Sequence, residues 1–373
     1  MGSGGTVVSG QAWRRWGVVL AVVAVLCSVP IVINVWPARA ADVDPATLRQ
    51  RMAGSAGQVY QGFAQSAGLL PLPSLPNLEQ VTDLVSSTNE MRVWYGGPDR
   101  WRVDVVEGGA ERDLYQTPDS QYVWDYGDNQ LTQIVGEQPV RLPRAADLTP
   151  PELVRRLLGI AEGDRFEALA GRRVAGIAAA GMRIVPATAD TTVDHVDVWA
   201  DPATGLPVQA EVTARGGERP VFVTRFLELH LDAPDPEVLT PPRDRPGIGF
   251  TVTTAPDVLS AINRRRPTFL PDRLAGAPRR DAVTGLTAAG VYGTGLARFV
   301  VAALPGRFGR EAYDRVQTFG TAVDMPAGAD AALIGTGLLT VLVVRAERTY
   351  LVAGLVEPEL LERVAVDLSE AVT

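Results

Sequence analysis

The chain has 373 residues, 46% of them hydrophobic, and a formal net charge of −8. This length exceeds that of a typical single domain and indicates two folded domains with a targeting segment. The negative charge disfavours nucleic acid as a partner. Because the chain has one cysteine, Cys27, and no lysine, its sequence excludes a disulfide framework and lysine-based covalent catalysis.

The first 41 residues have the pattern of a membrane-targeting segment. Arg14 and Arg15 precede an uncharged run over 16–38, which at about 1.5 Å per residue can cross a hydrocarbon core of about 30 Å. The run is longer than the core of a secretory signal, which favours a retained anchor helix after a short cytoplasmic tail. Cleavage after Ala40 is the alternative, and it would give a secreted or periplasmic protein. In both cases we expect the folded domains to be extracytoplasmic, at the cell membrane if the anchor is kept.

A first domain is predicted over 42–242. Asp44 followed by Pro45 is a helix start, with an N-cap and a proline in the first turn. The segment 68–78 then contains three prolines, which exclude a regular helix or a central strand. Its leucines include Leu69, Leu70 and Leu72. Two interpretations stay open: a stiff connector that lays leucines on the core, or a mobile rim over an apolar cavity.

A series of short strands with turns between them follows. The alternation of apolar and polar residues predicts five strands, over 90–95, 100–107, 111–116, 121–126 and 130–135. Trp101 and Val103 share one face of their strand, and Tyr122 and Trp124 share one face of theirs. Such strands form an antiparallel sheet with one face packed on the core and the other exposed to solvent. A helix over 149–160 and further strands complete an α+β domain.

The stretch from Val196 to Val212 is the most specific part of the sequence. Its apolar residues alternate on both sides of a turn, so it predicts a β-hairpin. Within the turn, Asp201 can bond the backbone two residues on, and Gly205 can adopt the positive φ that closes it. The segment from Trp199 to Glu211 reads W-x-D-P-x-T-G-L-P-x-x-x-E.

This hairpin resembles one that recurs in the LolA and LppX lipoprotein-carrier superfamily, which includes the RseB/MucB regulators of envelope stress. The resemblance implies a curved antiparallel half-barrel with helices on its concave side and an apolar cavity that binds lipid. Which face of each strand points into that cavity is left open by the sequence. The candidate lining residues are Leu69, Leu70, Leu72, Trp94, Trp101, Val103, Tyr122 and Trp124.

A second domain is predicted over 243–373, after a proline-rich, charged boundary at 241–247. It contains a hairpin around 293–295, a second strand pair that turns at 345–348, and a terminal helix over 358–368. This smaller α+β layout is similar to the C-terminal domain of the RseB/MucB group.

The sequence contains no motif of a catalytic or metal site. His195 and His230 are its only histidines, and they lack the spacing of a metal site. Glycine-rich phosphate loops and nucleophile elbows are also missing from the sequence. We therefore expect no catalytic residues, no cofactor and no metal, and a protein that is not an enzyme.

Two hypotheses for function remain. The first is a binding protein whose cavity holds the acyl chains of a lipid or lipoprotein, either as a carrier, for example beside a membrane transporter, or as a sensor. The second follows from the resemblance to RseB/MucB: a regulator that binds the extracytoplasmic domain of an anti-sigma factor. The second domain favours the regulator, because simple carriers have only the first domain.

Overall fold

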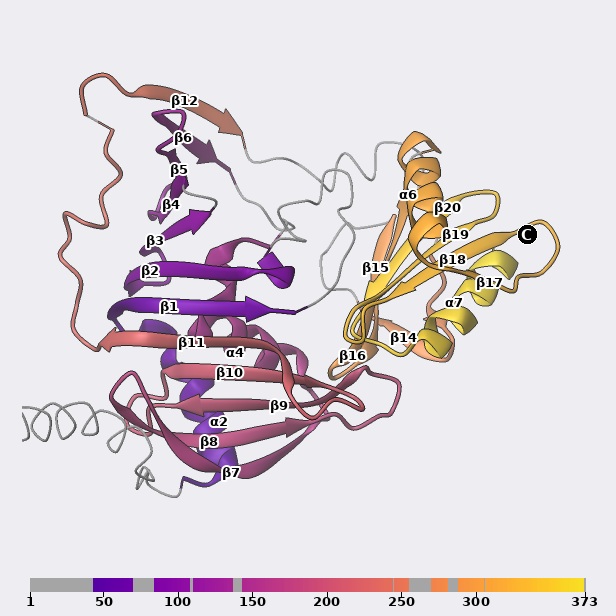
Figure 1. Ribbon diagram of the computed structural model, residues 1–373, viewed down its shortest axis with the longest axis horizontal. Helices are drawn as coiled ribbons and strands as arrows, with labels where there is room; N and C mark the ends of the chain where they lie inside the picture. Colours follow the sequence, from indigo (N-terminus) through magenta and orange to yellow (C-terminus); the bar gives the residue numbers. More distant parts are fainter. Residues whose placement is uncertain are drawn as a thin grey trace, which may run out of the picture.

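The computed structural model describes residues 43–69, 84–107, 110–136, 143–243, 245–254, 270–280, 288–304 and 306–371. The predicted anchor segment and the candidates Leu70 and Leu72 lie outside these residues. Among the helices of the described part, none is long and apolar enough to span a membrane. Figure 1 shows two sheets, with the C-terminal one at the right.

The larger sheet contains twelve strands within the described residues. Its spatial order is β12-β6-β5-β4-β3-β2-β1-β11-β10-β9-β8-β7. The predicted strands of the meander are confirmed as β2 to β6. The bounds are β1 (Tyr60–Gly68), β2 (Thr88–Gly97), β3 (Arg100–Glu107), β4 (Ala110–Gln116), β5 (Gln121–Asp125), β6 (Gln130–Val135), β7 (Arg165–Val174), β8 (Ile177–Val185), β9 (Val193–Ala200), β10 (Pro207–Ala214), β11 (Pro220–His230) and β12 (Gly249–Thr254).

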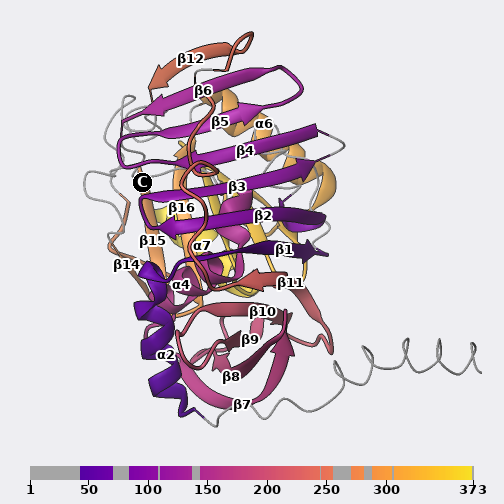
Figure 2. The same cartoon turned by 90° about the vertical axis from the view of Figure 1, so that its left-hand side faces the viewer.

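Helices α2 (Pro45–Gly54) and α4 (Pro150–Ile160) cover one face of the sheet half that runs from β7 to β11. We call this face concave, because the sheet curves around the helices (Figure 2). Leu48 and Met52 of α2 and Val154 of α4 are completely shielded from solvent there. Asp44 caps α2 as predicted, accepting from Thr47 N at 3.1 Å. The concave face of this half is therefore filled by the chain itself.

The predicted hairpin is confirmed as β9 and β10, and its turn contacts α2. Asp201 accepts hydrogen bonds from Thr204 N and Thr204 Oγ1 at 3.1 and 2.6 Å. Gly205 has φ +74°, and a Cβ there would lie 2.4 Å from the carbonyl carbon of Arg51. Arg51 in turn donates to Pro202 O at 2.5 Å. The glycine is needed both for the turn and for this close approach to the helix.

The opposite, convex face is crossed by the segment 231–243 and 245–248, which we call the crossing segment. It leads from β11 past β2 and β3 to the far edge of the sheet, where β12 pairs in parallel with β6 (Figures 1 and 2). Arg102 donates to Val238 O at 3.5 Å, and the guanidinium of Arg243 lies 4.5 Å from the Tyr122 ring centre. Strand β12 thus belongs to the first sheet, although it lies beyond the expected boundary at residue 242.

The smaller sheet contains eight strands within the described residues, in the order β13-β14-β15-β16-β20-β19-β18-β17. Both hairpins expected from the sequence, β15–β16 and β19–β20, are confirmed. The bounds are β13 (Arg273–Leu274), β14 (Ala277–Arg280), β15 (Ala289–Thr294), β16 (Ala297–Leu304), α6 (Gly306–Phe319), β17 (Thr321–Val323), β18 (Asp330–Gly335), β19 (Thr340–Arg345), β20 (Thr349–Gly354) and α7 (Pro358–Glu370).

Helices α6 and α7 cover opposite faces of this sheet. On β19, Leu342 and Val344 belong to the cluster that contains α7, whereas Val343 packs with Val316 of α6. Helix α6 was not expected from the sequence, and Gly306 and Gly309 in its first turn weaken its helix propensity. Its Gly309 has a packing reason, since a Cβ there would lie 2.6 Å from Thr349 Cβ.

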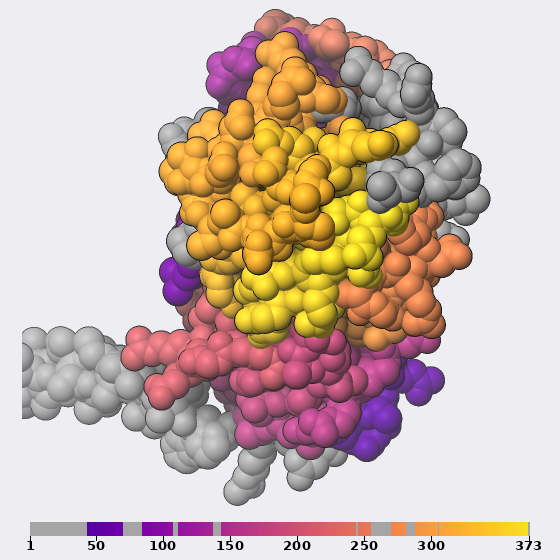
Figure 3. All heavy atoms as spheres, turned by 90° about the vertical axis from the view of Figure 1, so that its right-hand side faces the viewer, coloured from indigo at the N-terminus to yellow at the C-terminus, as the bar shows by residue number. Residues whose placement is uncertain are grey.

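In Figure 3 the C-terminal domain, orange to yellow, lies against the magenta strands of the first domain. Hydrogen bonds between backbone groups, and others to the buried carboxylate of Asp164, join the two sheets. Asp164 accepts from Ala187 N at 3.0 Å in its own domain and from Leu296 N at 2.9 Å in the other. Thr192 N donates to Leu355 O at 3.2 Å, and Glu357 N donates to Asp190 O at 2.9 Å. The interface between the domains is therefore specific, because backbone groups of both domains form hydrogen bonds across it.

Replacing Asp164 by alanine is expected to lower the free energy of unfolding by about 2–4 kcal/mol, because two amide groups lose a charged acceptor. Urea unfolding of the full-length chain measures this. The control is Asp330→Ala, which removes an exposed ion pair with Arg345 at 2.7 Å inside the second domain and should cost about 0–1 kcal/mol. Equal losses in the two variants would show that Asp164 does not hold the joint.

Candidate functional site

The concave face of the other sheet half, β2 to β6, has apolar rows. Val93 lies opposite Val103, Val103 opposite Leu114, and Leu114 opposite Val123. Directly opposed residues of an antiparallel pair project from the same face, so these side chains form one row across four strands. Tyr95 with Trp101, and Met91 with Val105, form the flanking rows.

Two cavities lie over these rows. The first has a volume of about 280 Å³ and the second of about 420 Å³. The first is lined by Ala56, Tyr60, Val93, Tyr95, Pro98, Trp101, Val103, Gln116, Gln121, Ala146, Asp147, Thr149, Glu152 and Arg155. The second is lined by Leu84, Val105, Arg112, Leu114, Val123, Asp125, Asp128, Gln130, Thr132, Ile134, Pro143, Arg144 and Ala145.

The segment 143–149, which contains the short helix η2 (Ala145–Leu148), separates the two cavities. Arg144 N donates to Asp147 Oδ2 at 2.8 Å, which closes the first turn of η2. Thr224 Oγ1 of β11 donates to Leu148 O at 2.6 Å. The divider is therefore fixed to the central part of the sheet through β11.

One wall of the first cavity carries charge. Arg155 Nη2 of α4 donates to Glu152 Oε2 at 3.1 Å, and Glu152 Oε1 accepts from Arg156 at 3.0 Å. Arg155 Nη1 is buried and has no hydrogen-bond partner within the described part of the chain. Burial raises the pKa of Tyr60 and of Tyr95, two aromatic residues of the same wall, so both phenols are neutral. The cavity thus combines an apolar floor with one incompletely paired guanidinium.

The structure divides the predicted lining residues between the two faces. Trp101 and Val103 line the first cavity. Tyr122 and Trp124 lie on the convex face, buried with Tyr115 and Leu131 and packed by Ile248 of the crossing segment. The reason is that Tyr122 pairs with Tyr115 across the strands, whereas the concave rows of β5 run through Val123.

Of the remaining candidates, the described ones, Trp94 and Leu69, line neither cavity. Trp94 is on the convex face, where the guanidinium of Arg102 lies 5.0 Å from its ring centre. Leu69 is 75% exposed at the end of β1. The second cavity is lined by three residues that were not predicted from the sequence, Leu114, Val123 and Ile134. Counting the alternation from Val103 through the short turns would have found them, because turn length fixes the register.

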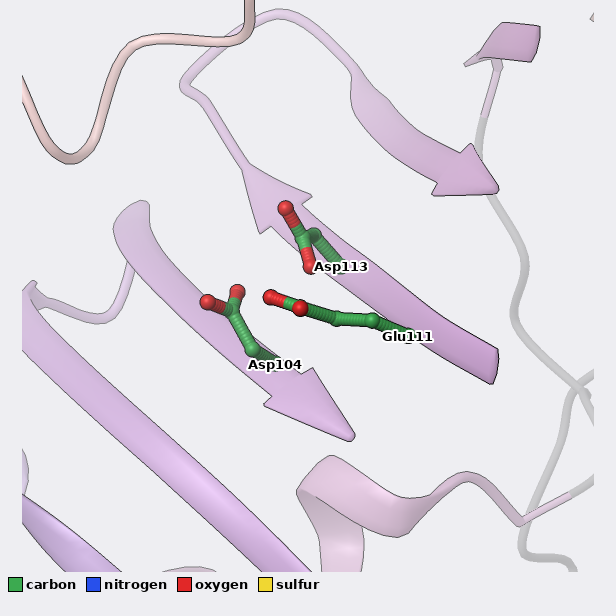
Figure 4. A group of neighbouring side chains, drawn as sticks. All are labelled: Asp104, Glu111 and Asp113. Atoms are coloured by element: carbon green, nitrogen blue, oxygen red, sulfur yellow. The ribbon is translucent and has the colours of Figure 1, made fainter. Parts of the chain in front are cut away.

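A cluster of carboxylates lies on the convex face. Asp104 of β3 and Glu111 and Asp113 of β4 have carboxylate oxygens within 4.8 Å of one another (Figure 4). Arg102 donates to both oxygens of Asp104, at 2.6 and 2.7 Å, and to Asp113 at 2.8 Å. One guanidinium therefore serves two buried carboxylates.

Asp113 is the carboxylate of this cluster that binds a proton most readily. Burial, together with the neighbouring Asp104, raises the pKa of Asp113 to about 7. Its Oδ1 is buried without a hydrogen-bond partner in the part of the chain that the structure describes. Burial also raises the pKa of Asp104, but Asp104 receives two charge-assisted bonds from Arg102, so Asp113 is the member of the pair that takes up a proton first.

The sequence matches no model of a known protein family and no curated protein. Solved structures do match. The MucA/MucB complex of Pseudomonas aeruginosa is 19% identical and has a TM-score of 0.44, covering 87% of this chain and 98% of that chain. An uncharacterized conserved protein from Thermus thermophilus is 12% identical with a TM-score of 0.33, covering 56% of this chain and 98% of that one.

A LolA superfamily protein from Nitrosomonas europaea is 12% identical with a TM-score of 0.25, covering 53% of this chain and 98% of that chain. The matches include both groups that the hairpin resembles. Similarity at this level of identity concerns the fold, and the site is described by its own geometry.

The Asp113 pKa predicts a pH dependence of stability. The folded chain keeps a proton that the unfolded chain releases near the ordinary value of 3.8. The stabilisation from this group is therefore complete below pH 4 and is lost as the pH rises towards 7. Asp113→Asn, which mimics the protonated acid, should gain stability relative to the native chain over this range in urea unfolding.

The matched control is Asp125→Asn. The hydrogen bond from Arg112 lowers the pKa of Asp125, so its contribution has the opposite sign and appears as the pH rises. This contribution is complete above the unfolded value of 3.8, so the variant should lose stability by a constant amount between pH 4 and 8. If the difference in the free energy of unfolding between Asp113→Asn and the native chain is constant from pH 4 to 8, then Asp113 is ionised over this whole range.

Proposed function

We propose that this protein is an extracytoplasmic, non-enzymatic binding protein that holds acyl chains in the two cavities on its concave face. One observation carries the proposal: α2 and α4 fill the concave face over β7 to β11, while the apolar rows of β2 to β6 line two cavities. Their volumes, about 280 and 420 Å³, are of the order found for small-molecule sites.

The energetics favour an apolar chain as the occupant. Protein interiors are normally close-packed, and apolar walls without neighbours forfeit dispersion contacts. Val103 and Leu114 are buried at the centre of the concave rows and supply such walls. Each methylene that leaves water for such a wall contributes about 0.8 kcal/mol. A chain of several methylenes therefore binds without any catalytic group.

The anchor expected from the sequence bears on how such a protein would work. A chain held at the membrane suits a fixed sensor, or an acceptor that takes lipid from a transporter. If the segment is cleaved after Ala40, the same cavities suit a carrier that moves between membranes. Both forms use the same acyl site, so one binding experiment addresses both.

A second candidate function is that of a regulator that binds the extracytoplasmic domain of an anti-sigma factor. The observation in its favour is the second domain, which is docked to the first through Asp164 and the Thr192–Leu355 contact. A specific interface of this kind suits a protein that binds its partner with both domains and changes its affinity for that partner when a ligand binds. Titration of the full-length chain with such a domain, with and without an acyl ligand, tests this: binding that weakens on lipid addition supports it, and no binding in either state refutes it.

Trp101→Asp tests the acyl site, because it places a carboxylate on the floor of the first cavity. We expect at least a tenfold loss of the lipid that co-purifies with the full-length chain, since a buried unpaired charge opposes an apolar ligand. Organic extraction and mass spectrometry measure the retained lipid per chain.

The matched control is Trp94→Asp, the same substitution on the neighbouring strand but on the convex face beneath Arg102. It should retain lipid like the native chain. Equal loss in the two variants would point to general destabilisation, and native protein that carries no lipid would refute the acyl site.

A further inference from the structure

Strand β12 forms one end of the larger sheet, and no described strand lies beyond it (Figures 1 and 2). Gly249 N donates to Asn129 O at 2.9 Å, so the backbone of Gly249 faces the neighbouring strand β6. Backbone N–H and C=O groups of alternate residues point to the same side of a strand, which turns those of Phe250 and Val252 outward. These outward groups have no hydrogen-bond partner among the described residues. The edge is therefore open for pairing.

The side chains of β12 add an exposed apolar row at this edge. Phe250 lies opposite Leu131, which belongs to the buried cluster on the convex face. Phe250 and Val252 therefore project from the convex face, where they are 48% and 55% exposed. A strand added beside β12 would place every second side chain next to this row.

The other edges of the two sheets are protected against pairing. Strand β7, at the opposite end of the larger sheet, carries Arg165, Glu167, Arg172 and Arg173, and its register shifts between Leu169 and Arg172. Strands β13 and β17, at the ends of the smaller sheet, contain only two and three residues. Charges, bulges and short length are devices by which proteins prevent edge pairing. Strand β12 uses none of them, because it has six residues without a charge and an unbroken register with β6.

The size of this edge favours a peptide over a second copy of the chain. Stable interfaces between folded proteins use about 20–30 residues on each side. Strand β12 offers six. An extended peptide needs no such area, because main-chain hydrogen bonds supply its affinity and alternate side chains supply its selectivity. The strand also lacks a charge that would select an anionic or a cationic ligand.

We propose that β12 binds an extended segment of another polypeptide, which adds a strand to the larger sheet and pairs antiparallel with Phe250 and Val252. Antiparallel pairing is the more stable arrangement per residue. The bound segment carries apolar residues at alternate positions, and these extend the exposed row on the convex face. Since β12 lines neither cavity, this site goes beyond the proposed acyl site and does not depend on it.

The probe is a dye-labelled octapeptide in which valine and threonine alternate, and fluorescence anisotropy follows its binding to the full-length chain. Valines that share the convex face with Phe250 and Val252 turn their N–H groups towards β12 in an antiparallel pair. N-methylation of two valines should therefore weaken binding at least about tenfold, whereas N-methylation of two threonines should leave it nearly unchanged.

The pattern of the two methylated peptides decides whether an edge is used. A reversed order also requires edge pairing, with the peptide parallel to β12 or turned over. Equal effects of the two modifications, or no binding of the unmethylated peptide, would refute the proposal. This comparison uses the native chain, so it holds even if a variant does not fold.

Val252→Pro tests the site from the side of the protein. Proline removes only an outward N–H at this position and is tolerated in edge strands, so β12 should stay paired with β6 while peptide binding falls at least about tenfold. Val252→Arg should also weaken binding, because a charge at an edge opposes pairing. Leu227→Arg is the matched control. Leu227 is 39% exposed and lies in β11, which has a strand on both sides, so this variant should bind the peptide like the native chain.

Sedimentation equilibrium of the native chain separates the two possible occupants. A monomer that binds the peptide supports the proposal. A dimer that Val252→Pro converts to a monomer would show that a second copy occupies β12, and would overturn it. Trp101→Asp should bind the peptide like the native chain, so the acyl site and the strand site can fail independently.

Discussion

The pairing of β1 with two partners is the constraint on which the first domain depends. β1 bonds β2 on one side and β11 on the other, and so joins two hairpin series that would otherwise form separate sheets. Its glycines permit this, since a Cβ at Gly62 would lie 2.3 Å from Glu228 O and one at Gly68 would lie 1.9 Å from Val85 O. A shift of one residue in this register would exchange the concave and convex faces along the strand. The continuity of the concave face therefore depends on one strand.

The curved sheet is longer than its helices can cover. Helix α4 contacts β10 and β11, and α2 contacts β7 and β8, so the concave side chains of these strands form an ordinary core. Beyond β1 the same apolar alternation continues under the segment 143–149, with its short helix η2, and not under a long helix. The cavities arise at this change, and α4 contributes the charged wall of the first through Glu152 and Arg155. The packed core and the two cavities thus lie on one surface of the sheet, divided by where α2 and α4 end.

The convex face has a different organisation. Ion pairs with short distances, such as Arg183 with Asp197 at 2.6 Å, lie on the sheet half that runs from β7 to β11. On the other half the crossing segment buries Tyr122 and Trp124 and brings β12 back to β6. Arg102 connects the crossing segment to the buried Asp104 and Asp113 through one guanidinium. This face stabilises the sheet from behind, which leaves the concave face available for a ligand.

The sequence by itself determined the local elements: the strands of the meander, the capped first helix, and the turn from Asp201 to Gly205. These depend on alternation, capping and turn chemistry, which act over a few residues. Tertiary structure alone decided the rest. Tyr122 and Val123 are neighbours with similar strand propensity, yet one packs under the crossing segment and the other lines a cavity, because only strand pairing and the position of the helices distinguish two faces. The unpaired donor of Arg155 likewise depends on the packing of α4 over β10 and β11, a contact between residues far apart in the chain.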